Sequence, residues 1–127
     1  MNKTYIATGA TFICLGIVLG AFGAHSLKES LNSSELLSFE VGVRYQMYQG
    51  LALLAIGLNN NIELKNKLQY RGFTLGTLLF SGSIYFLAID RVLGMKLSWF
   101  GPITPIGGAV LIVTWIYFIY RIIKRKD

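Results

Sequence analysis

The sequence predicts an all-α fold, an integral membrane bundle of four transmembrane helices. Apolar residues make up 54% of the 127 residues and charged residues only 14%, and the mean hydropathy is +0.54. A soluble domain of this length does not carry so much apolar surface. Four long segments of low charge supply the helices, at residues 5–24, 35–58, 72–89 and 102–120. Together they predict a single membrane domain that covers residues 1–127.

The first segment is a run of 20 uncharged residues from Tyr5 to Ala24. At about 1.5 Å per residue, a helix of this length crosses a hydrocarbon core of about 30 Å. Gly16 and Gly20 lie four residues apart, a spacing that lets another helix approach closely. The basic Lys3 and the small residues that end the segment also fit a cleavable signal peptide. We predict a packed transmembrane helix, with cleavage as the alternative.

The second segment is the most polar of the four. Asn32 is followed three residues later by Glu35, a spacing that predicts a capping box at the start of the helix. Glu40 and Arg44 are spaced i,i+4 with the acid first, the order that favours an ion pair on a helix. Tyr48 continues the same face one turn deeper. We therefore expect a Glu–Arg pair just inside one boundary of the hydrocarbon.

The third and fourth segments carry glycines and prolines at informative positions. Gly72 and Gly76 form a second pair at close-packing spacing in the third segment. Pro102 fits the first turn of the fourth helix, whereas Pro105 removes a further backbone donor there. We expect a distorted or discontinuous start to the last helix.

Membrane topology accounts for the net charge of +6. Four crossings place both termini and the central linker on one side of the membrane, with eight Lys and Arg residues, and leave four on the other side. Because positive residues accumulate on the cytoplasmic side, both termini are predicted to be cytoplasmic. The protein is then a multi-pass protein of the cell membrane, and no nucleic-acid partner is predicted.

Polar side chains from several segments are expected to meet near the outer boundary. In one interpretation they join the helices by satisfying each other and the backbone near Pro105. In the other they form a solute or proton site that opens outward, because ionisable groups within membranes commonly mark such sites. The candidate residues are His25, Glu40, Arg44, Gln46, Tyr48, Asp90 and Thr104.

The sequence offers little for metal, cofactor or enzyme chemistry. One cysteine, Cys14, and one histidine, His25, do not provide the spacing of a metal site. Ser81 and Ser83 have no base nearby in the sequence and are interpreted as small packing residues. We predict no metal, no cofactor and no enzymatic activity.

Four sequence blocks carry a resemblance to a known family. The chain resembles the YwdK/YgdD-like inner-membrane proteins, the family known as domain of unknown function 423. The resemblance implies a small four-helix membrane protein and implies no reaction. Gln49 departs from the pattern, which has His at that position. The blocks are Gly20-Ala-Phe-Gly-Ala-His25, Phe39-Glu-Val-Gly-Val-Arg-Tyr-Gln-Met-Tyr48, Phe80-Ser-Gly-Ser-Ile-Tyr85 and Gly101-Pro-Ile-Thr-Pro-Ile-Gly-Gly108.

The predicted function is a non-enzymatic accessory or interaction component of the cytoplasmic membrane. Its predicted partners are the lipid bilayer and either another membrane protein or a second copy of the chain. The alternative is a small-solute or proton-coupled permease with a polar site in the outer half of the bundle. An interior filled by side chains favours the first function, and a water-accessible cavity that reaches Arg44 favours the second.

Overall fold

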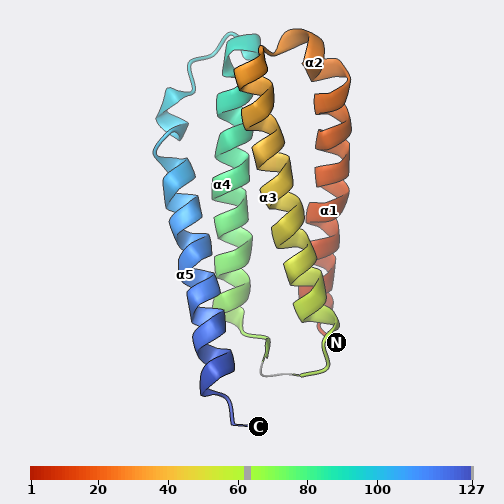
Figure 1. Ribbon diagram of the computed structural model, residues 1–127, viewed down its shortest axis with the longest axis vertical. Helices are drawn as coiled ribbons and strands as arrows, with labels where there is room; N and C mark the ends of the chain where they lie inside the picture. The colour runs from red at the N-terminus through yellow and green to blue at the C-terminus, as the bar shows by residue number, and fades with distance from the viewer. Residues whose placement is uncertain (62–63, 127) are drawn as a thin grey trace.

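Four long helices stand side by side in the computed structural model, which describes residues 1–61 and 64–126 (Figure 1). Within these ranges the chain forms no strand, so the predicted all-α class is confirmed. A short helix joins the first two long helices, and a 3₁₀ turn precedes the last. The elements are α1 (Lys3–Ala24), α2 (Ser26–Ser30), α3 (Ser33–Leu58), α4 (Lys67–Leu93), η2 (Ser98–Phe100) and α5 (Ile103–Lys124).

Successive long helices run in opposite directions, so the chain crosses the length of the bundle four times (Figure 1). Both termini lie at one end, together with the connection between α3 and α4. We call this the terminal end. The short helix α2 and the connection from α4 to α5 lie at the other end, the connector end.

The helices extend a few residues beyond the predicted ranges, and the difference is largest for α4. This helix covers Lys67–Leu93, whereas residues 72–89 were predicted. The side chain of Asn66 caps its start by accepting two backbone N–H groups, and Gly94 ends it with φ 68°. Hydropathy marks the part of a helix that suits hydrocarbon, whereas caps fix where the helix begins and ends. The five-residue α2 was not predicted, because a helix so short has no periodic pattern.

The predicted capping box at the start of α3 is confirmed. The backbone N–H of Glu35 donates to Asn32 Oδ1 at 2.8 Å, and the backbone N–H of Asn32 donates to Glu35 Oε1 at 2.9 Å. At the start of α5, Pro102 is the N-cap and Pro105 is the third helical residue. The first N–H groups of a helix have no intrahelical acceptor, so Pro105 interrupts no bond there. The discontinuity lies before the helix, in η2.

Glycines allow α1 to approach α3 closely. A Cβ atom at Gly16 would lie 2.6 Å from the Sδ of Met47, whereas one at Gly20 would lie 3.5 Å from the nearest carbon of Val43, an ordinary contact. The tightest approach is nearer the terminal end, where a Cβ at Gly9 would lie 2.6 Å from a backbone carbonyl oxygen of α3. Of the predicted pair, Gly16 therefore lies at the closer contact.

The second predicted glycine pair lies between α4 and α5. A Cβ at Gly72 would overlap the side chain of Thr114, and one at Gly76 would lie 2.8 Å from Leu111. Because both contacts reach residues of α5, this face of α4 packs against α5 without room for a side chain.

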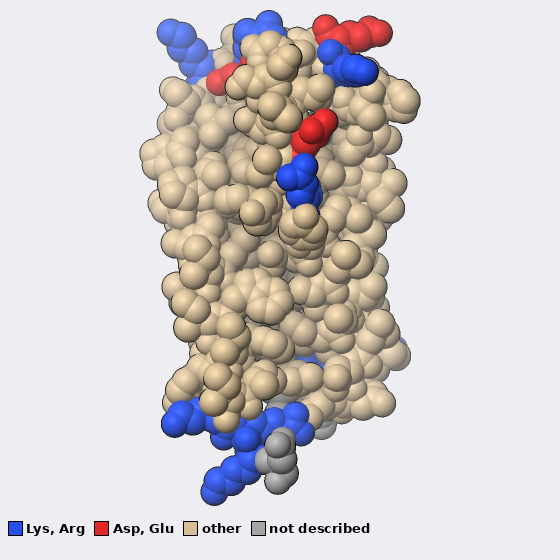
Figure 2. All heavy atoms as spheres, in the orientation of Figure 1, with Lys and Arg blue, Asp and Glu red and all other residues tan. Residues whose placement is uncertain are grey.

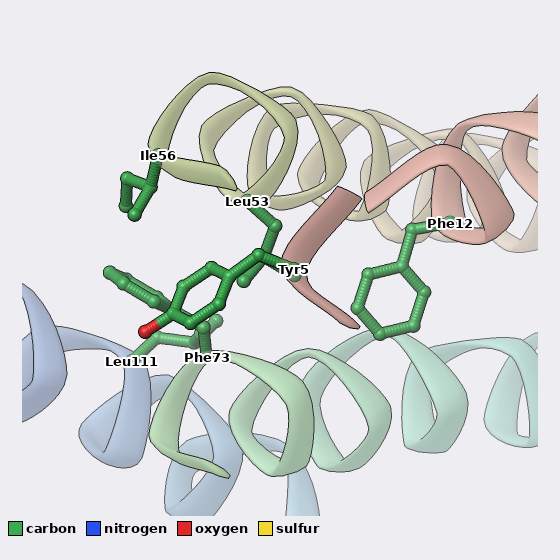
Figure 3. Close-up of a cluster of buried hydrophobic side chains, with 6 residues drawn as sticks. All are labelled: Tyr5, Phe12, Leu53, Ile56, Phe73 and Leu111. Atoms are coloured by element: carbon green, nitrogen blue, oxygen red, sulfur yellow. The ribbon is translucent and has the colours of Figure 1, made fainter. Parts of the chain in front are cut away.

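The main hydrophobic core draws on all four long helices and lies in the half of the bundle near the terminal end (Figure 3). A second, smaller cluster of Leu31, Phe39 and Ala88 lies near the connector end. These two clusters fix the mutual rotation of the helices. The six side chains of the main core are Tyr5, Phe12, Leu53, Ile56, Phe73 and Leu111.

Three stretches of the described chain are long and apolar enough to cross a membrane: Lys3–Ala24, Lys67–Leu93 and Ser98–Lys124. On the face that Figure 2 shows, charged side chains gather at the two ends of the molecule, and the surface between the ends is uncharged except for one acidic and one basic side chain. Such a band matches the hydrocarbon of a bilayer.

Candidate functional site

Helix α3 is the long helix that differs from the others. It is absent from the three stretches that are apolar enough to cross a membrane, although it lies beside α1 and α4 in the bundle (Figure 1). Its polar residues fall on two faces. One face is buried in the bundle, and the other is exposed on the lateral surface.

Glutamine side chains on the buried face of α3 form hydrogen bonds to the other three long helices. Gln46 donates from Nε2 to the backbone oxygen of Phe12 at 2.8 Å and accepts the hydroxyl of Tyr85 at Oε1, at 2.6 Å. Gln49 accepts the indole N–H of Trp115 at 3.1 Å. Each bond joins α3 to a different helix, so the two glutamines connect α3 to α1, α4 and α5 and leave no free polar group of Gln46 directed into a cavity.

The exposed face of α3 carries Glu40, Arg44 and Tyr48. Tyr48 is 54% exposed and contacts another tyrosine of the same face, Tyr45, edge to face. Among the described residues, neither Glu40 nor Arg44 takes part in a hydrogen bond or ion pair, so the ion pair predicted from their spacing is not formed. Nothing in the bundle holds these two side chains, because both point away from it.

The charged residues of this face lie within the length of α3 that would cross the hydrocarbon. One acidic and one basic side chain interrupt the uncharged lateral surface a short way below the charged connector end, in the upper part of the view (Figure 2). Beyond its first turn, the charged residues of α3 are Glu40 and Arg44. Counted from Leu58 at the terminal end, Arg44 lies about 21 Å along the helix and Glu40 about 27 Å, within a hydrocarbon thickness of about 30 Å.

The structure does not bring the seven predicted polar residues together. His25 is exposed in a shallow hollow where α1 meets α2. Thr104 shares a hydrogen bond of 2.5 Å with Ser83, which joins α5 to α4. Asp90 is half-buried in the last turns of α4. Gln46 lies inside the bundle, whereas Glu40, Arg44 and Tyr48 lie outside it.

An ion pair at the connector end escaped sequence reasoning. Arg91 Nη2 lies 2.8 Å from Glu35 Oε1, and the same nitrogen donates to the backbone oxygen of Ser30. The pair joins α4 to α3 across 56 positions of the chain. No local spacing could have indicated it.

A polar network at the terminal end was also missed. Gln69, which is fully buried, donates to the backbone oxygen of Leu64 at 2.9 Å and accepts from Arg121 at 3.1 Å. The hydroxyl of Tyr5 donates to the backbone oxygen of Asn66 at 2.8 Å. The sequence signal for this network was Gln69 itself, a polar residue at the edge of an apolar run. Across the described chain, no group of three His, Cys, Asp or Glu side chains is placed to hold a metal ion.

Comparisons with known proteins agree with one another. A family model described as "Protein of unknown function (DUF423)" matches residues 19–108. A UPF0382 membrane protein of Staphylococcus epidermidis is 38% identical over 124 residues, which cover 96% of this chain and 97% of the relative. A UPF0382 membrane protein of Haemophilus influenzae is 37% identical over 130 residues, and the match covers 100% of this chain and 99% of the relative.

A third relative is UPF0382 membrane protein YwdK of Bacillus subtilis. It is 34% identical over 125 residues, with 96% of this chain and 98% of YwdK covered. No solved structure matches the chain. The relatives are membrane proteins by name, and the helices have the length and composition to cross a bilayer more than once. The chain is thus a multi-pass membrane protein that belongs to the uncharacterised DUF423 family, whose members are also called UPF0382 membrane proteins.

Proposed function

We propose that this protein is a non-enzymatic interaction component of the cell membrane, and that the exposed face of α3 is its contact site. The observation that carries this proposal is the position of Glu40 and Arg44. They lie on the lateral surface, just inside the boundary at the connector end, and the bundle offers them no partner among the described residues. A charged residue at the centre of the bilayer costs about 2.5–3.5 kcal/mol on insertion scales, and a position nearer the boundary carries part of that cost. A contact that covers this face offsets that cost.

The proposal includes four crossings with both termini in the cytoplasm. Helix α3 begins beside the end of α1 and ends beside the start of α4, so it returns the chain across the same layer (Figure 1). The terminal end carries eight Lys and Arg residues and the connector half carries four, which supports a cytoplasmic terminal end. Reporter fusions at Asn60 and after residue 127 should both report a cytoplasmic location. A reporter exported at either point contradicts this topology.

The exposed face has the periodicity of a helix contact. Leu37, Arg44, Leu51 and Leu58 are spaced seven residues apart, and all four are exposed. A repeat of seven lines up along one side of a helix and is the pattern of a contact between two helices. A helix face that contacts only lipid does not need a repeat of seven.

A second copy of the chain is the partner that this face fits best. Glu40 and Arg44 lie one turn apart, with opposite charges. A twofold axis perpendicular to the membrane sets the same face against itself with both copies in the same orientation. Each Glu40 is then within reach of Arg44 of the other copy, which gives two symmetric pairs and leaves neither charge without an opposite charge.

The alternative, a permease, finds less support. A permease of the predicted kind needs a water-accessible cavity that leads to Arg44, but Arg44 is exposed on the lateral face of α3, outside the bundle. Both polar ends of the Gln46 side chain are used by Phe12 and Tyr85.

A photocrosslinking amino acid at Tyr48 tests the contact site. Two copies with different tags are expressed together in cells, and the crosslinker is placed at Tyr48 of one copy. We expect a crosslinked product that carries both tags. The control places the crosslinker at Ile116, which is 60% exposed on α5 in the apolar band. Equal yields at the two positions, or none at Tyr48, would refute the proposal. A crosslink to a different protein would support the interaction role and would show that this protein, and not a second copy of the chain, is the partner.

A further inference from the structure

Two hollows meet at Arg71, at the terminal end of the bundle. One is a polar hollow of about 730 Å³ between the start of α1, the α3–α4 connection and the start of α4. The other is an apolar groove of about 700 Å³ that runs between α4 and α5. Arg71 lines both of them, and neither is lined by Glu40, Arg44 or Tyr48 of the α3 contact site.

Positive charge converges on the polar hollow. Lys65, Lys67 and Arg71 line it, and its described lining contains no acidic residue. Lys65 also lowers the pKa of the Met1 amino group, first by a hydrogen bond and then by charge repulsion, so positive groups crowd one another here. The four acidic residues that the structure describes all belong to elements of the opposite half: Glu29, Glu35, Glu40 and Asp90. The hollow therefore suits an anion.

The groove beside it suits a hydrocarbon chain. Its walls carry apolar side chains that face outward from the bundle, such as Leu68 and Val113, which are 65% and 64% exposed. On α5 it extends from Ile106 to Tyr117, about 16 Å at 1.5 Å per residue. One leaflet contributes about half of a hydrocarbon core of about 30 Å. The groove thus matches the depth of one leaflet and reaches Arg71 at its polar end.

We propose that these hollows together bind one anionic phospholipid from the leaflet at the terminal end. Its phosphate lies among Lys65, Lys67 and Arg71, and one acyl chain lies in the groove between α4 and α5. A free anion would occupy the polar hollow alone, because it has no hydrocarbon chain to place in the groove. The positive residues that set membrane orientation need only lie on one side of the membrane. They need not converge on one hollow that continues into an apolar groove.

Lipid binding to the purified full-length protein tests this inference. In a neutral detergent, native mass spectrometry compares bound phosphatidylglycerol with bound phosphatidylcholine of identical acyl chains. We expect a preference for phosphatidylglycerol. Arg71→Gln should weaken phosphatidylglycerol binding about fivefold, the usual contribution of one basic side chain near an anionic headgroup. The matched control Lys96→Gln removes one exposed positive charge at the connector end and should leave binding unchanged.

Two further variants separate headgroup from chain. Lys65→Gln lies outside the helices, so it should reduce phosphatidylglycerol binding without disturbing helix packing. Ala109→Phe fills the exposed groove and should reduce the binding of both lipids. Equal binding of the two lipids, or equal losses in Arg71→Gln and Lys96→Gln, would overturn the proposal. Inorganic phosphate that competes as well as phosphatidylglycerol, with no effect of Ala109→Phe, would indicate a free-anion site and also overturn it.

Discussion

The two faces of α3 treat polar side chains in opposite ways. On the buried face, Gln46 uses both ends of its amide to bond α1 and α4. On the exposed face, Glu40 and Arg44 bond to no described residue. The two faces belong to the same helix, and Arg44 on one face is only two positions from Gln46 on the other. The polarity of α3 therefore has two causes, one in the internal architecture and one on the outside of the bundle.

This difference teaches that polarity in a membrane helix does not by itself mark an interior site. The exposed face of α5 gives the reference for lipid contact, since Ile112, Val113 and Ile116 are all strongly exposed and apolar. The exposed face of α3 departs from that reference at its charged and tyrosine residues and at the serines near its start, such as Ser38. The predictions below separate the contributions of the two faces, beginning with the buried one.

The largest effect is expected where the buried face of α3 meets α1. A Cβ at Gly9 would lie 2.6 Å from a backbone oxygen, which cannot move aside without moving the helix. Gly9→Leu should destabilise the protein by about 3 kcal/mol, the upper part of the range for overpacking. Gly20→Leu is the matched control, because its nearest neighbour lies 3.5 Å away. Thermal unfolding in detergent measures both variants. Equal losses would mean that α1 and α3 do not cross closely at Gly9.

The next effect concerns the paired amide. Gln46→Leu keeps the volume but leaves the hydroxyl of Tyr85 and the carbonyl of Phe12 without their partner, so we expect a loss of about 2 kcal/mol. Gln49→Leu breaks one longer bond, to Trp115, and should cost less. Thermal unfolding of both variants under one set of conditions gives the comparison. If Gln49→Leu is the more damaging change, Gln46 does not connect the helices as described.

These pairings also show what the sequence could and could not predict. Hydropathy identified the helical segments, and the Asn32–Glu35 spacing identified the start of α3, because both signals are local. The partners of Gln46 were not predictable, since they depend on how α1 and α4 are rotated about their own axes. That rotation follows from packing contacts such as Gly9 against α3, which no local pattern specifies.

The candidate site was predicted in composition but not in arrangement. Sequence reasoning placed Glu40 and Arg44 with Gln46 because all lie in one polar stretch. The structure separates them because Phe39 and Gly42 occupy the core side of the helix at this level, where Gly42 faces Tyr85. Glu40 and Arg44 each lie two positions from Gly42, about half a turn around the helix, so they are directed outward. A polar helix can conceal this division when only its average polarity is considered.

The exposed face should respond to charge changes in the bilayer. Glu40→Gln or Arg44→Gln alone leaves one charge without an opposite charge in the proposed contact, so each should weaken association by about 1 kcal/mol. The double variant should recover part of this loss. Energy transfer between two labelled copies in liposomes, as a function of dilution, measures association. Strictly additive losses would show that the two residues have separate partners.

The smallest effect is expected at Glu35, the acid on α3 that does have a basic partner. Its carboxylate lies 2.8 Å from Arg91 and also accepts the backbone N–H of Asn32 in the capping box. Glu35→Gln keeps the capping bond, because an amide oxygen still accepts that N–H, and removes only the charge opposite Arg91. Exposed ion pairs contribute little and are screened by salt, so the melting temperature should fall slightly and only at low ionic strength. Glu35→Ala also removes the acceptor of the Asn32 N–H, although the backbone N–H at position 35 still donates to Asn32. Its melting temperature should therefore fall further at every ionic strength. Melting curves of both variants in low and high salt distinguish the two roles, and identical curves would mean that this capping bond contributes nothing beyond the ion pair.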